Sequence, residues 1–270
     1  MGLRDLSSKL LTPARGLGVV GWTSTMLAAV ETHKLAERTL GSGARQEAIF
    51  DGYQRVWTSG LLRMFAVDFH VVGVLPPPAS GARLVVSNHR TVYDIGVLIS
   101  HFGGSVLSRG DLEQWPLLGV AAQKAQTIFV DRADKHSGAT AIRAIRAQLE
   151  RGRTISVFPE GGTFAGDEVR EFNAGAFVAC RKLDVEFVPV GIAYPPGVDW
   201  ETGGFLEHLS MLGERPRTRA AIAIGAPFRS QDSARKLAPR LHEQVQALVH
   251  RARAQLDADA SASCLSGARI

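Results

Sequence analysis

The residues of this chain best suited to chemistry lie together in residues 87–94, which read Ser-Asn-His-Arg-Thr-Val-Tyr-Asp. They follow a short apolar run, residues 84–86, that is typical of a buried strand, and they precede an apolar segment, residues 95–99, that favours a helix. His89 therefore stands where a strand ends and a helix begins. Asp94 follows after four intervening residues, so one helical turn brings its carboxylate back toward the imidazole. Such a pair can act as a general base on a hydroxyl group, because the carboxylate fixes the histidine tautomer and stabilises the imidazolium.

A surface histidine beside a helix start has the same spacing, so the pair alone does not establish a site. A second segment, residues 158–163, reads Phe-Pro-Glu-Gly-Gly-Thr and follows another apolar strand, residues 154–157. Its two glycines let backbone amides approach a bound group closely. A structural turn would explain the proline and the glycines, but it would not require Glu160 between them.

Together these segments resemble the glycerolipid acyltransferase family, the group of the lysophosphatidic acid acyltransferases and their relatives. Asn88, His89 and Asp94 match the family's His-x4-Asp motif, and residues 158–161 match its Phe-Pro-Glu-Gly motif.

Two further blocks support the resemblance. Residues 127–132 are similar to the family's second block, which ends in Arg132, and residues 187–193 are similar to its fourth. The four blocks occur in the family's order over residues 83–194, and this order is more specific than any single motif.

The resemblance implies an O-acyltransferase in which His89 removes the proton of an acceptor hydroxyl and Asp94 stabilises the imidazolium. The donor would be a fatty acyl thioester, acyl-CoA or acyl carrier protein, used as a co-substrate with no further cofactor and no metal. Ser87 is an alternative nucleophile for a covalent mechanism, although a thioester needs none. The residues implied in acceptor binding are Arg132, Glu160, Gly161, Gly162 and Thr163.

The chain departs from the family pattern in the acceptor region. Gly162 and Thr163 stand where phosphate-binding members carry threonine and arginine, and Asn173 stands where they carry lysine. Loss of both cations weakens a site for a doubly charged phosphate monoester. Arg170 and Lys182 are the nearby cations that could replace them.

The resemblance implies 1-acylglycerol-3-phosphate as the acceptor, in phospholipid biosynthesis. A lyso-ornithine lipid is the alternative acceptor, and a thioesterase or hydrolase acting on water at the same site is the alternative activity.

Composition agrees with one enzyme-sized domain. Of the 270 residues, 45% are hydrophobic and 21% are charged, so the chain is long and apolar enough to bury a full core. The net charge of +5 suits an anionic membrane surface or an acidic carrier protein, and the basic residues lack the aromatic interleaving of a nucleic-acid module. Cys180 and Cys264 lie far apart, which argues against a disulfide framework or metal cluster and for a reducing cytoplasm.

Apolar strand-like runs alternate with helical patterns, which predicts an α/β fold with a mixed, largely parallel sheet flanked by helices. We assign residues 1–74 to an N-terminal helical, membrane-associating segment, residues 75–256 to the acyltransferase domain and residues 257–270 to a flexible tail. Ligands of such sheets bind at the carboxyl ends of the strands, where both His89 and Glu160 fall. Strands are predicted near residues 69–74, 84–87, 104–108, 127–130, 154–158, 186–192 and 219–226. Helices are predicted near residues 93–101, 116–124, 137–151, 174–182 and 232–255.

The N-terminal segment predicts contact with a membrane. Residues 17–30 are apolar and uncharged but shorter than the roughly 20 residues that span a bilayer. They favour a helix in the interface with Trp22 at headgroup depth, and a buried core helix is the alternative. A second helix, residues 46–65, has a wide apolar face that packs on the domain or joins the first helix in the bilayer. We therefore expect a peripheral or monotopic protein on the cytoplasmic face of the inner membrane.

Overall fold

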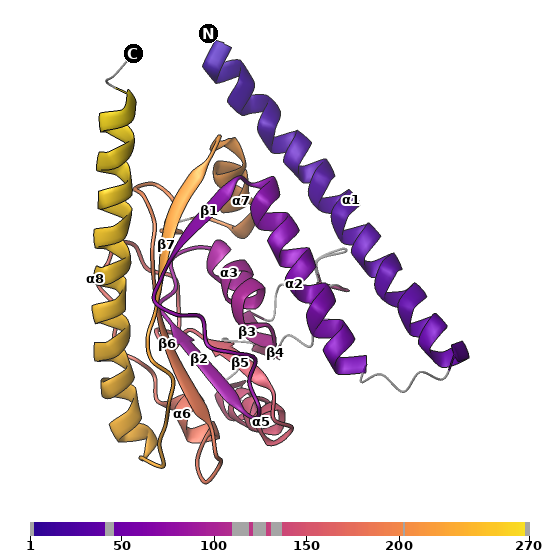
Figure 1. Cartoon of the computed structure of the whole chain (residues 1–270), viewed down its shortest axis with the longest axis vertical. Coiled ribbons are helices and arrows are strands. Elements are labelled where there is room, and N and C mark those ends of the chain that lie inside the picture. The colour runs from indigo at the N-terminus through magenta and orange to yellow at the C-terminus, as the bar shows by residue number, and fades with distance from the viewer. Residues whose placement is uncertain are drawn as a thin grey trace.

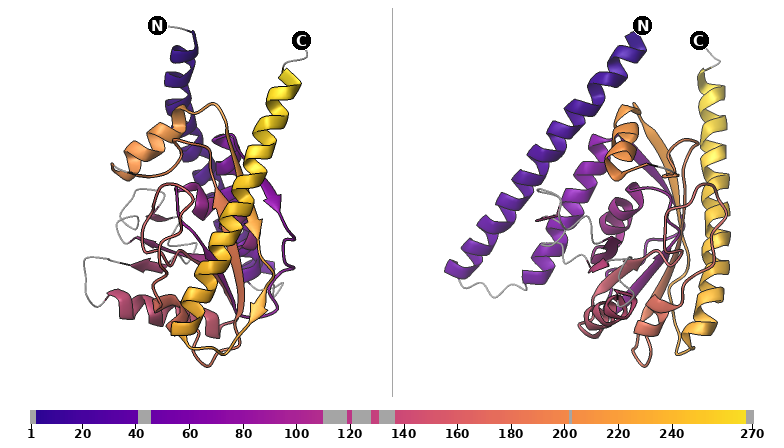
Figure 2. Two further views of the ribbon diagram at one scale, coloured as in Figure 1. Left: turned by 90° about the vertical axis from the view of Figure 1, so that its left-hand side faces the viewer. Right: turned by 180° about the vertical axis from the view of Figure 1, so that it is seen from behind.

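The computed structural model describes residues 3–40, 46–109, 119–120, 128–130, 137–201 and 203–267. A mixed sheet forms the centre and helices cover both of its faces (Figure 1), which confirms the predicted fold class. The amino and carboxyl ends of the chain lie at the same end of the molecule in all three views (Figures 1 and 2).

The sheet has the strand order β1-β7-β6-β2-β5-β3-β4, with β8 paired to β6. Its strands are β1 (Val67–Val72), β2 (Arg83–Ser87), β3 (Ser105–Arg109), β4 (Ile128–Val130), β5 (Thr154–Val157), β6 (Glu186–Ala193), β7 (Thr218–Ile224) and β8 (Phe228–Arg229). The pairings of β6 with β7 and with β8 are antiparallel, and the other recorded pairings are parallel. β2 lies between β5 and β6, so the segment that leaves its carboxyl end emerges near the middle of the sheet.

Helices form a layer on each face of the sheet (Figure 2). They are α1 (Leu3–Leu40), α2 (Gln46–Met64), α3 (Tyr93–Phe102), α5 (Ser137–Glu150), α6 (Gly175–Ala179), α7 (Phe205–Glu214) and α8 (Ala234–Gly267). α5, α6 and α8 contribute to the core on one face, and α2, α3 and α7 contribute to the core on the other. α1 packs outside α2 and α7.

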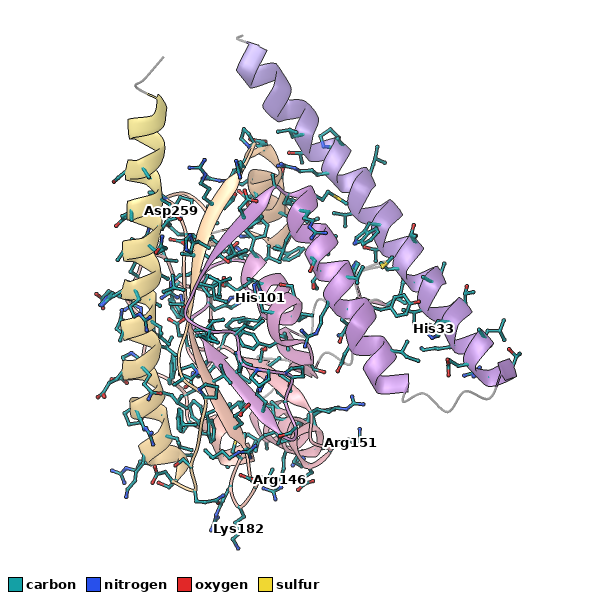
Figure 3. All side chains as sticks on the ribbon, viewed as in Figure 1. His33, His101, Arg146, Arg151, Lys182 and Asp259 are labelled. Carbon is teal, nitrogen blue, oxygen red and sulfur yellow. The ribbon has the colours of Figure 1, made fainter. Side chains whose placement is uncertain are left out.

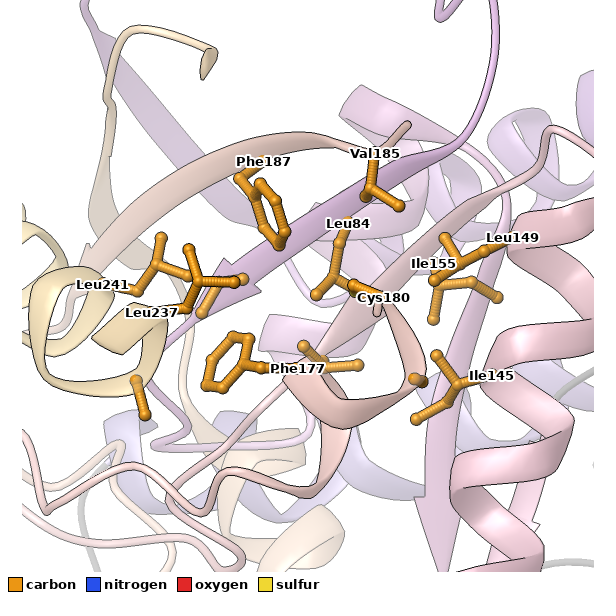
Figure 4. Packing of buried hydrophobic residues seen from close by; sticks show 14 of the residues in the cluster. Leu84, Ile145, Leu149, Ile155, Phe177, Cys180, Val185, Phe187, Leu237 and Leu241 are labelled. Atoms are coloured by element: carbon orange, nitrogen blue, oxygen red, sulfur yellow. The ribbon is translucent and has the colours of Figure 1, made fainter. Parts of the chain in front are cut away.

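The central strand β2 shows how the sequence forms two cores. Leu84 and Val86 pack among side chains of α5, α6 and α8, which Figure 4 shows around Leu84 and Phe177. Val85, between them, packs on the opposite face with residues of α3. Successive side chains of a strand point to opposite faces, so a strand covered on both sides must be a continuous apolar run. β2 is therefore rigidly packed up to the residue before the His-x4-Asp segment.

The seven predicted strands are present with ends displaced by a few residues at most. α7 and β8 were missed by the sequence reading. The predicted helix over residues 116–124 lies outside the described residues apart from 119–120, which are helical. α8 continues to Gly267, where the sequence reading placed a flexible tail from residue 257; alanine at alternate positions there favours helix strongly enough to extend it.

α1 and α2 form an antiparallel pair, and a tryptophan of each helix donates a hydrogen bond to the other helix. The Trp22 indole N–H donates to the carbonyl of Trp57 at 3.0 Å, and the Trp57 indole N–H donates to Thr23 Oγ1 at 3.1 Å. Gly60 makes room for this contact, because a Cβ there would lie 2.4 Å from Trp22 Nε1. Trp22 is therefore part of the contact between the two helices, and its expected position at headgroup depth stays a prediction. Among the described residues, no helix has the length and apolarity needed to cross a membrane.

A buried arginine joins α1 to the domain. The Arg15 guanidinium donates to the carbonyls of Met64, Gly213 and Arg215, at 3.0, 2.8 and 2.6 Å. β1 also pairs with β7 inside the sheet. The assigned boundary after residue 74 thus leaves one strand of the sheet in the N-terminal segment, since β1 precedes it.

Candidate active site

His89 lies just beyond the carboxyl end of β2, and Asp94 lies in the first turn of α3. The His89 Nδ1 atom and the Asp94 Oδ2 atom are 2.8 Å apart. Asn88 anchors this junction to the neighbouring strand, because its side-chain amide donates to the Ile192 carbonyl and accepts from the Ile192 N–H, at 2.9 and 2.8 Å. The predicted pairing of His89 with Asp94 is present in the structure.

Four donors converge on the Asp94 carboxylate, which is fully buried. Oδ2 accepts from His89 and from the backbone N–H groups of Arg90 and Thr91, at 2.6 and 2.9 Å for the last two. Oδ1 accepts from the Tyr194 hydroxyl at 2.7 Å. Burial, and then the Asp94 charge, raise the pKa of Tyr194 well above its ordinary value, so the phenol keeps the proton that it donates.

The geometry indicates which ring nitrogen of His89 carries a proton. Asp94 accepts at Nδ1, so Nδ1 carries a proton and Nε2 has the lone pair. The ring stacks on Phe158, with centroids 4.1 Å apart and planes inclined by 12°. Its side chain remains 14% exposed, whereas the carboxylate behind it is buried. Nε2 is therefore the nitrogen left to meet a substrate proton.

Glu160, the glutamate of the second motif, forms a buried ion pair with Arg90. Arg90 Nη1 lies 2.9 Å from Oε1 and 3.2 Å from Oε2, and the two side chains are 2% and 0% exposed. The same carboxylate accepts from the His89 backbone N–H at 2.7 Å and from the Arg170 backbone N–H at 2.9 Å. Further carbonyls, of Gly166 and Glu168, accept from the arginine, so the pair has the hydrogen bonds that a buried pair needs.

This arrangement favours a positioning role for Glu160 over the acceptor contact predicted from its motif. Both of its oxygens are occupied by groups of the chain, and the side chain has no exposed surface. The carboxylate instead ties the backbone of His89 to the loop that follows Gly161.

The glycines of the second motif make a tight turn beside this ion pair. Gly161 has φ +80°, and its N–H donates to the Phe158 carbonyl at 3.2 Å, so this amide closes the turn. A Cβ there would lie 2.8 Å from the Asn173 side-chain nitrogen. Gly162 and Thr163 are partly exposed next to the turn, and their predicted role in acceptor binding stays a prediction.

Arg132 and Lys182 were also predicted as cations of the acceptor site. Arg132 lies outside the described residues, whereas residues 128–130 of the second block form β4. Lys182 precedes β6, whose first residue, Glu186, pairs with Arg83 at the start of β2. It lies with Arg146 and Arg151 at the lower end of the view in Figure 3. Lys182 is therefore at the opposite end of β2 from His89, and the idea that it reaches the acceptor was wrong.

Arg90, Tyr194 and His208 were missed in the sequence. His208 Nε2 lies 2.8 Å from Thr91 Oγ1, its ring stacks on Trp200, and burial lowers its pKa to about 4, so it is neutral at pH 7. A cation for the buried glutamate could have been sought inside the motif itself, where Arg90 stands next to the histidine. Tyr194 directly follows the fourth block, at the carboxyl end of a strand parallel to β2. The sequence carries no comparable signal for His208.

Two alternatives were tested against the described residues. The Ser87 side chain belongs to a residue with no exposed surface in β2, which excludes its hydroxyl as a nucleophile in this conformation. No group of three or more histidine, cysteine or carboxylate side chains suited to a metal ion occurs in the part of the chain that the structure describes.

Comparisons with known proteins agree with the motifs. The sequence model of the family described as Acyltransferase matches residues 68–193. Lyso-ornithine lipid O-acyltransferase of Pseudomonas aeruginosa is 30% identical over 225 residues, which cover 81% of each chain. The 1-acyl-sn-glycerol-3-phosphate acyltransferase of Neisseria gonorrhoeae is 28% identical over 123 residues, 46% of this chain and 48% of that protein. The crystal structure of the 1-acyl-sn-glycerophosphate acyltransferase PlsC from Thermotoga maritima has the same fold, with a TM-score of 0.73 at 19% identity over 93% of this chain and 98% of that one.

Proposed function

Because the chain belongs to the family of lysolipid and 1-acyl-sn-glycerol-3-phosphate O-acyltransferases, we propose that it transfers a fatty acyl group from a thioester to the hydroxyl of a lysolipid. The observation that carries the mechanism is the hydrogen bond from His89 Nδ1 to buried Asp94, which leaves Nε2 as the base. Acyl-CoA or acyl carrier protein supplies the thioester as co-substrate.

The reaction needs one proton carrier. Nε2 of His89 takes the acceptor's hydroxyl proton as the oxygen attacks the thioester carbonyl, and the new imidazolium is stabilised by Asp94. The carbon–sulfur bond then breaks, the thiolate leaves, and the proton passes from Nε2 to the sulfur. A thiolate is a good leaving group, so the acyl group need not be held on the enzyme.

Two observations favour an acceptor with a less charged headgroup than the 1-acylglycerol-3-phosphate expected from the motifs. Thr163 offers no positive charge, and the Asn173 side-chain amide donates to the Pro159 carbonyl at 3.0 Å within its own loop. The relative from Pseudomonas aeruginosa, which matches over four fifths of both chains, is named for a lyso-ornithine lipid, whereas the 1-acyl-sn-glycerol-3-phosphate acyltransferase of Neisseria gonorrhoeae matches over about half. A lyso-ornithine lipid is therefore our first candidate acceptor.

The direct test uses purified protein, labelled acyl-CoA or acyl carrier protein, and a panel of lysolipids, with the products resolved by mass. Acylated lysolipid is the expected product. Thioester loss at an equal rate with and without any acceptor would instead identify a thioesterase and end the proposal.

Thr163→Arg is expected to shift acceptor preference toward lysophosphatidic acid. The arginine restores a bidentate donor where the family pattern has one, and a charged hydrogen bond contributes roughly 1.5–3 kcal/mol. The ratio of kcat/KM for lysophosphatidic acid to kcat/KM for monoacylglycerol should therefore rise roughly tenfold. An unchanged ratio would show that phosphate is already neutralised by another cation.

We further propose that the protein works at an anionic membrane surface on the cytoplasmic side. α1 exposes Leu17 and Val20 at 77% and 55%, on the part of the helix that the sequence assigned to the interface. The net charge of +5 adds an attraction that salt screens.

A double change, Leu17→Asp with Val20→Asp, should release most of the protein from anionic liposomes in a sedimentation assay. Both side chains are exposed, so the fold should be retained, unlike after deletion of residues 17–30, which would remove Trp22 and Thr23 from the contact with α2. Val178→Asp, on the exposed side of α6, is the matched control and should sediment like the parent. Equal sedimentation of the double variant and the parent would refute membrane contact through α1.

A further inference from the structure

The departures from the family pattern at residues 162, 163 and 173 raise the question of what neutralises an anionic headgroup beside His89. The structure describes one loop, residues 164–172, that runs from the glycine turn past the ion pair of Arg90 and Glu160. Arg170 is an exposed residue of this loop, and two separate contacts link it to residues that bind the His89 backbone.

The first contact holds the backbone of Arg170. Its N–H donates to Glu160 Oε2 at 2.9 Å, and the other oxygen of that carboxylate accepts from the His89 N–H at 2.7 Å. One buried carboxylate therefore bridges the backbones of the two residues.

The second contact holds its side chain. The Arg170 guanidinium carbon lies over the Phe164 ring, 5.5 Å from the centroid, a favourable cation–π arrangement. Phe164 is itself tied to the histidine, because its N–H donates to the His89 carbonyl at 3.1 Å. Both the backbone and the side chain of Arg170 are thus linked to the His89 backbone, each through one intervening residue.

Gly162 connects this placement to the altered motif. A Cβ at residue 162 would lie 3.3 Å from Phe164 Cζ, tighter than an ordinary contact, so a larger residue there would push on the ring that carries Arg170. The loss of threonine at 162 and of arginine at 163 therefore coincides with an aromatic platform for a different arginine.

Contacts with α8 and with Asp199 also hold this loop. Arg253 of α8 makes a two-pronged ion pair with Asp167, at 2.7 and 2.9 Å, and Asp199 accepts from the Gly166 N–H at 3.0 Å. Gln246 accepts from the Val169 N–H at 2.7 Å. The residues just before Arg170 are therefore held in place, and after it the Asn173 N–H donates to the Pro159 carbonyl at 2.8 Å.

We infer that Arg170 binds the anionic group of the lysolipid headgroup, a carboxylate or a phosphate, in place of the arginine and lysine that the family motif would supply. The inference deepens the proposed function and rests on it for the identity of the ligand as a lysolipid. An arginine suits both anions, because its planar fork donates two parallel hydrogen bonds.

The test measures binding separately from turnover. Titration calorimetry would give the Kd of the parent, of Arg170→Gln and of Arg151→Gln for three monomeric lysolipids: lyso-ornithine lipid with a carboxylate, lysophosphatidic acid with a phosphate, and uncharged monoacylglycerol. Arg151 is an exposed arginine at the far end of the molecule (Figure 3), which makes it the matched control.

Arg170→Gln should weaken binding of at least one anionic lysolipid roughly tenfold or more and leave monoacylglycerol binding unchanged, whereas Arg151→Gln should change none of the three. The anionic lipid that loses affinity identifies the headgroup chemistry. Equal losses for charged and uncharged lipids, or no loss for either anion, would overturn the inference. Because these are equilibrium constants, they stand even if the direct assay shows no acyl transfer, in which case the proposed function alone fails.

Discussion

His89→Ala is expected to lower kcat for acyl transfer by a factor of roughly 10² to 10⁴, because the variant has no group to take the proton of the acceptor hydroxyl. The side chain that is lost is stacked on Phe158 and 14% exposed, so its removal should leave the fold largely intact. Single-turnover rates with the labelled thioester would measure the effect. Turnover near that of the parent in a folded His89→Ala protein would remove the mechanism proposed above.

The matched control is His101→Ala, at the last turn of the same helix, α3, and away from Asp94 in its first turn. It should retain the parent's rate. Asp94→Asn is a less clean test of the mechanism, because four donors converge on that carboxylate and an amide group would turn a fifth donor toward them. We expect Asp94→Asn to lose both activity and stability.

Glu160→Gln should lower the free energy of unfolding by about 3–5 kcal/mol and also reduce turnover per folded molecule. The change leaves the Arg90 charge buried without its carboxylate, and the cost of an uncompensated buried charge is of that size. It also weakens the hydrogen bond that fixes the His89 backbone. Urea unfolding would measure the first effect, and kcat corrected for the folded fraction would measure the second.

β2 provides an internal control for this prediction. At its other end Arg83 pairs with Glu186 at 2.5 Å, with side chains 4% and 23% exposed. Glu186→Gln should also destabilise the fold, by less since its carboxylate is partly hydrated, and should leave turnover per folded molecule unchanged. If both variants are destabilised but keep the parent's turnover per folded molecule, Glu160 has no positioning role.

The sheet and the pairing of His89 with Asp94 could be predicted from sequence because each depends on local patterns. A strand buried on both faces must be continuously apolar, and His89 and Asp94 are separated by about one turn of helix. α7 was missed although its apolar residues recur at helical spacing; it is only 10 residues long and follows a glycine-rich loop.

The partners of the site could not be predicted because they come from distant parts of the chain. Tyr194 and Glu160 are separated from Asp94 and His89 by 100 and 71 residues, and only the strand order β6-β2-β5 brings them together. The interpretation of Glu160 as a headgroup contact followed from its motif. Its burial against Arg90 depends on the course of the loop after Gly161, which no pattern of residue types specifies.

The anchoring of α1 by Arg15 has a consequence for how the chain is made. Two of the carbonyls that accept from Arg15 belong to residues 213 and 215, which are 198 and 200 positions later. At a synthesis rate of roughly 5–20 residues per second, those partners appear on the order of 10–40 s after Arg15 itself. β1 also waits for β7, whose Thr218 lies 151 positions after its partner Val67. α1 and β1 thus leave the ribosome well before α7 and β7, the elements against which they pack in the native structure.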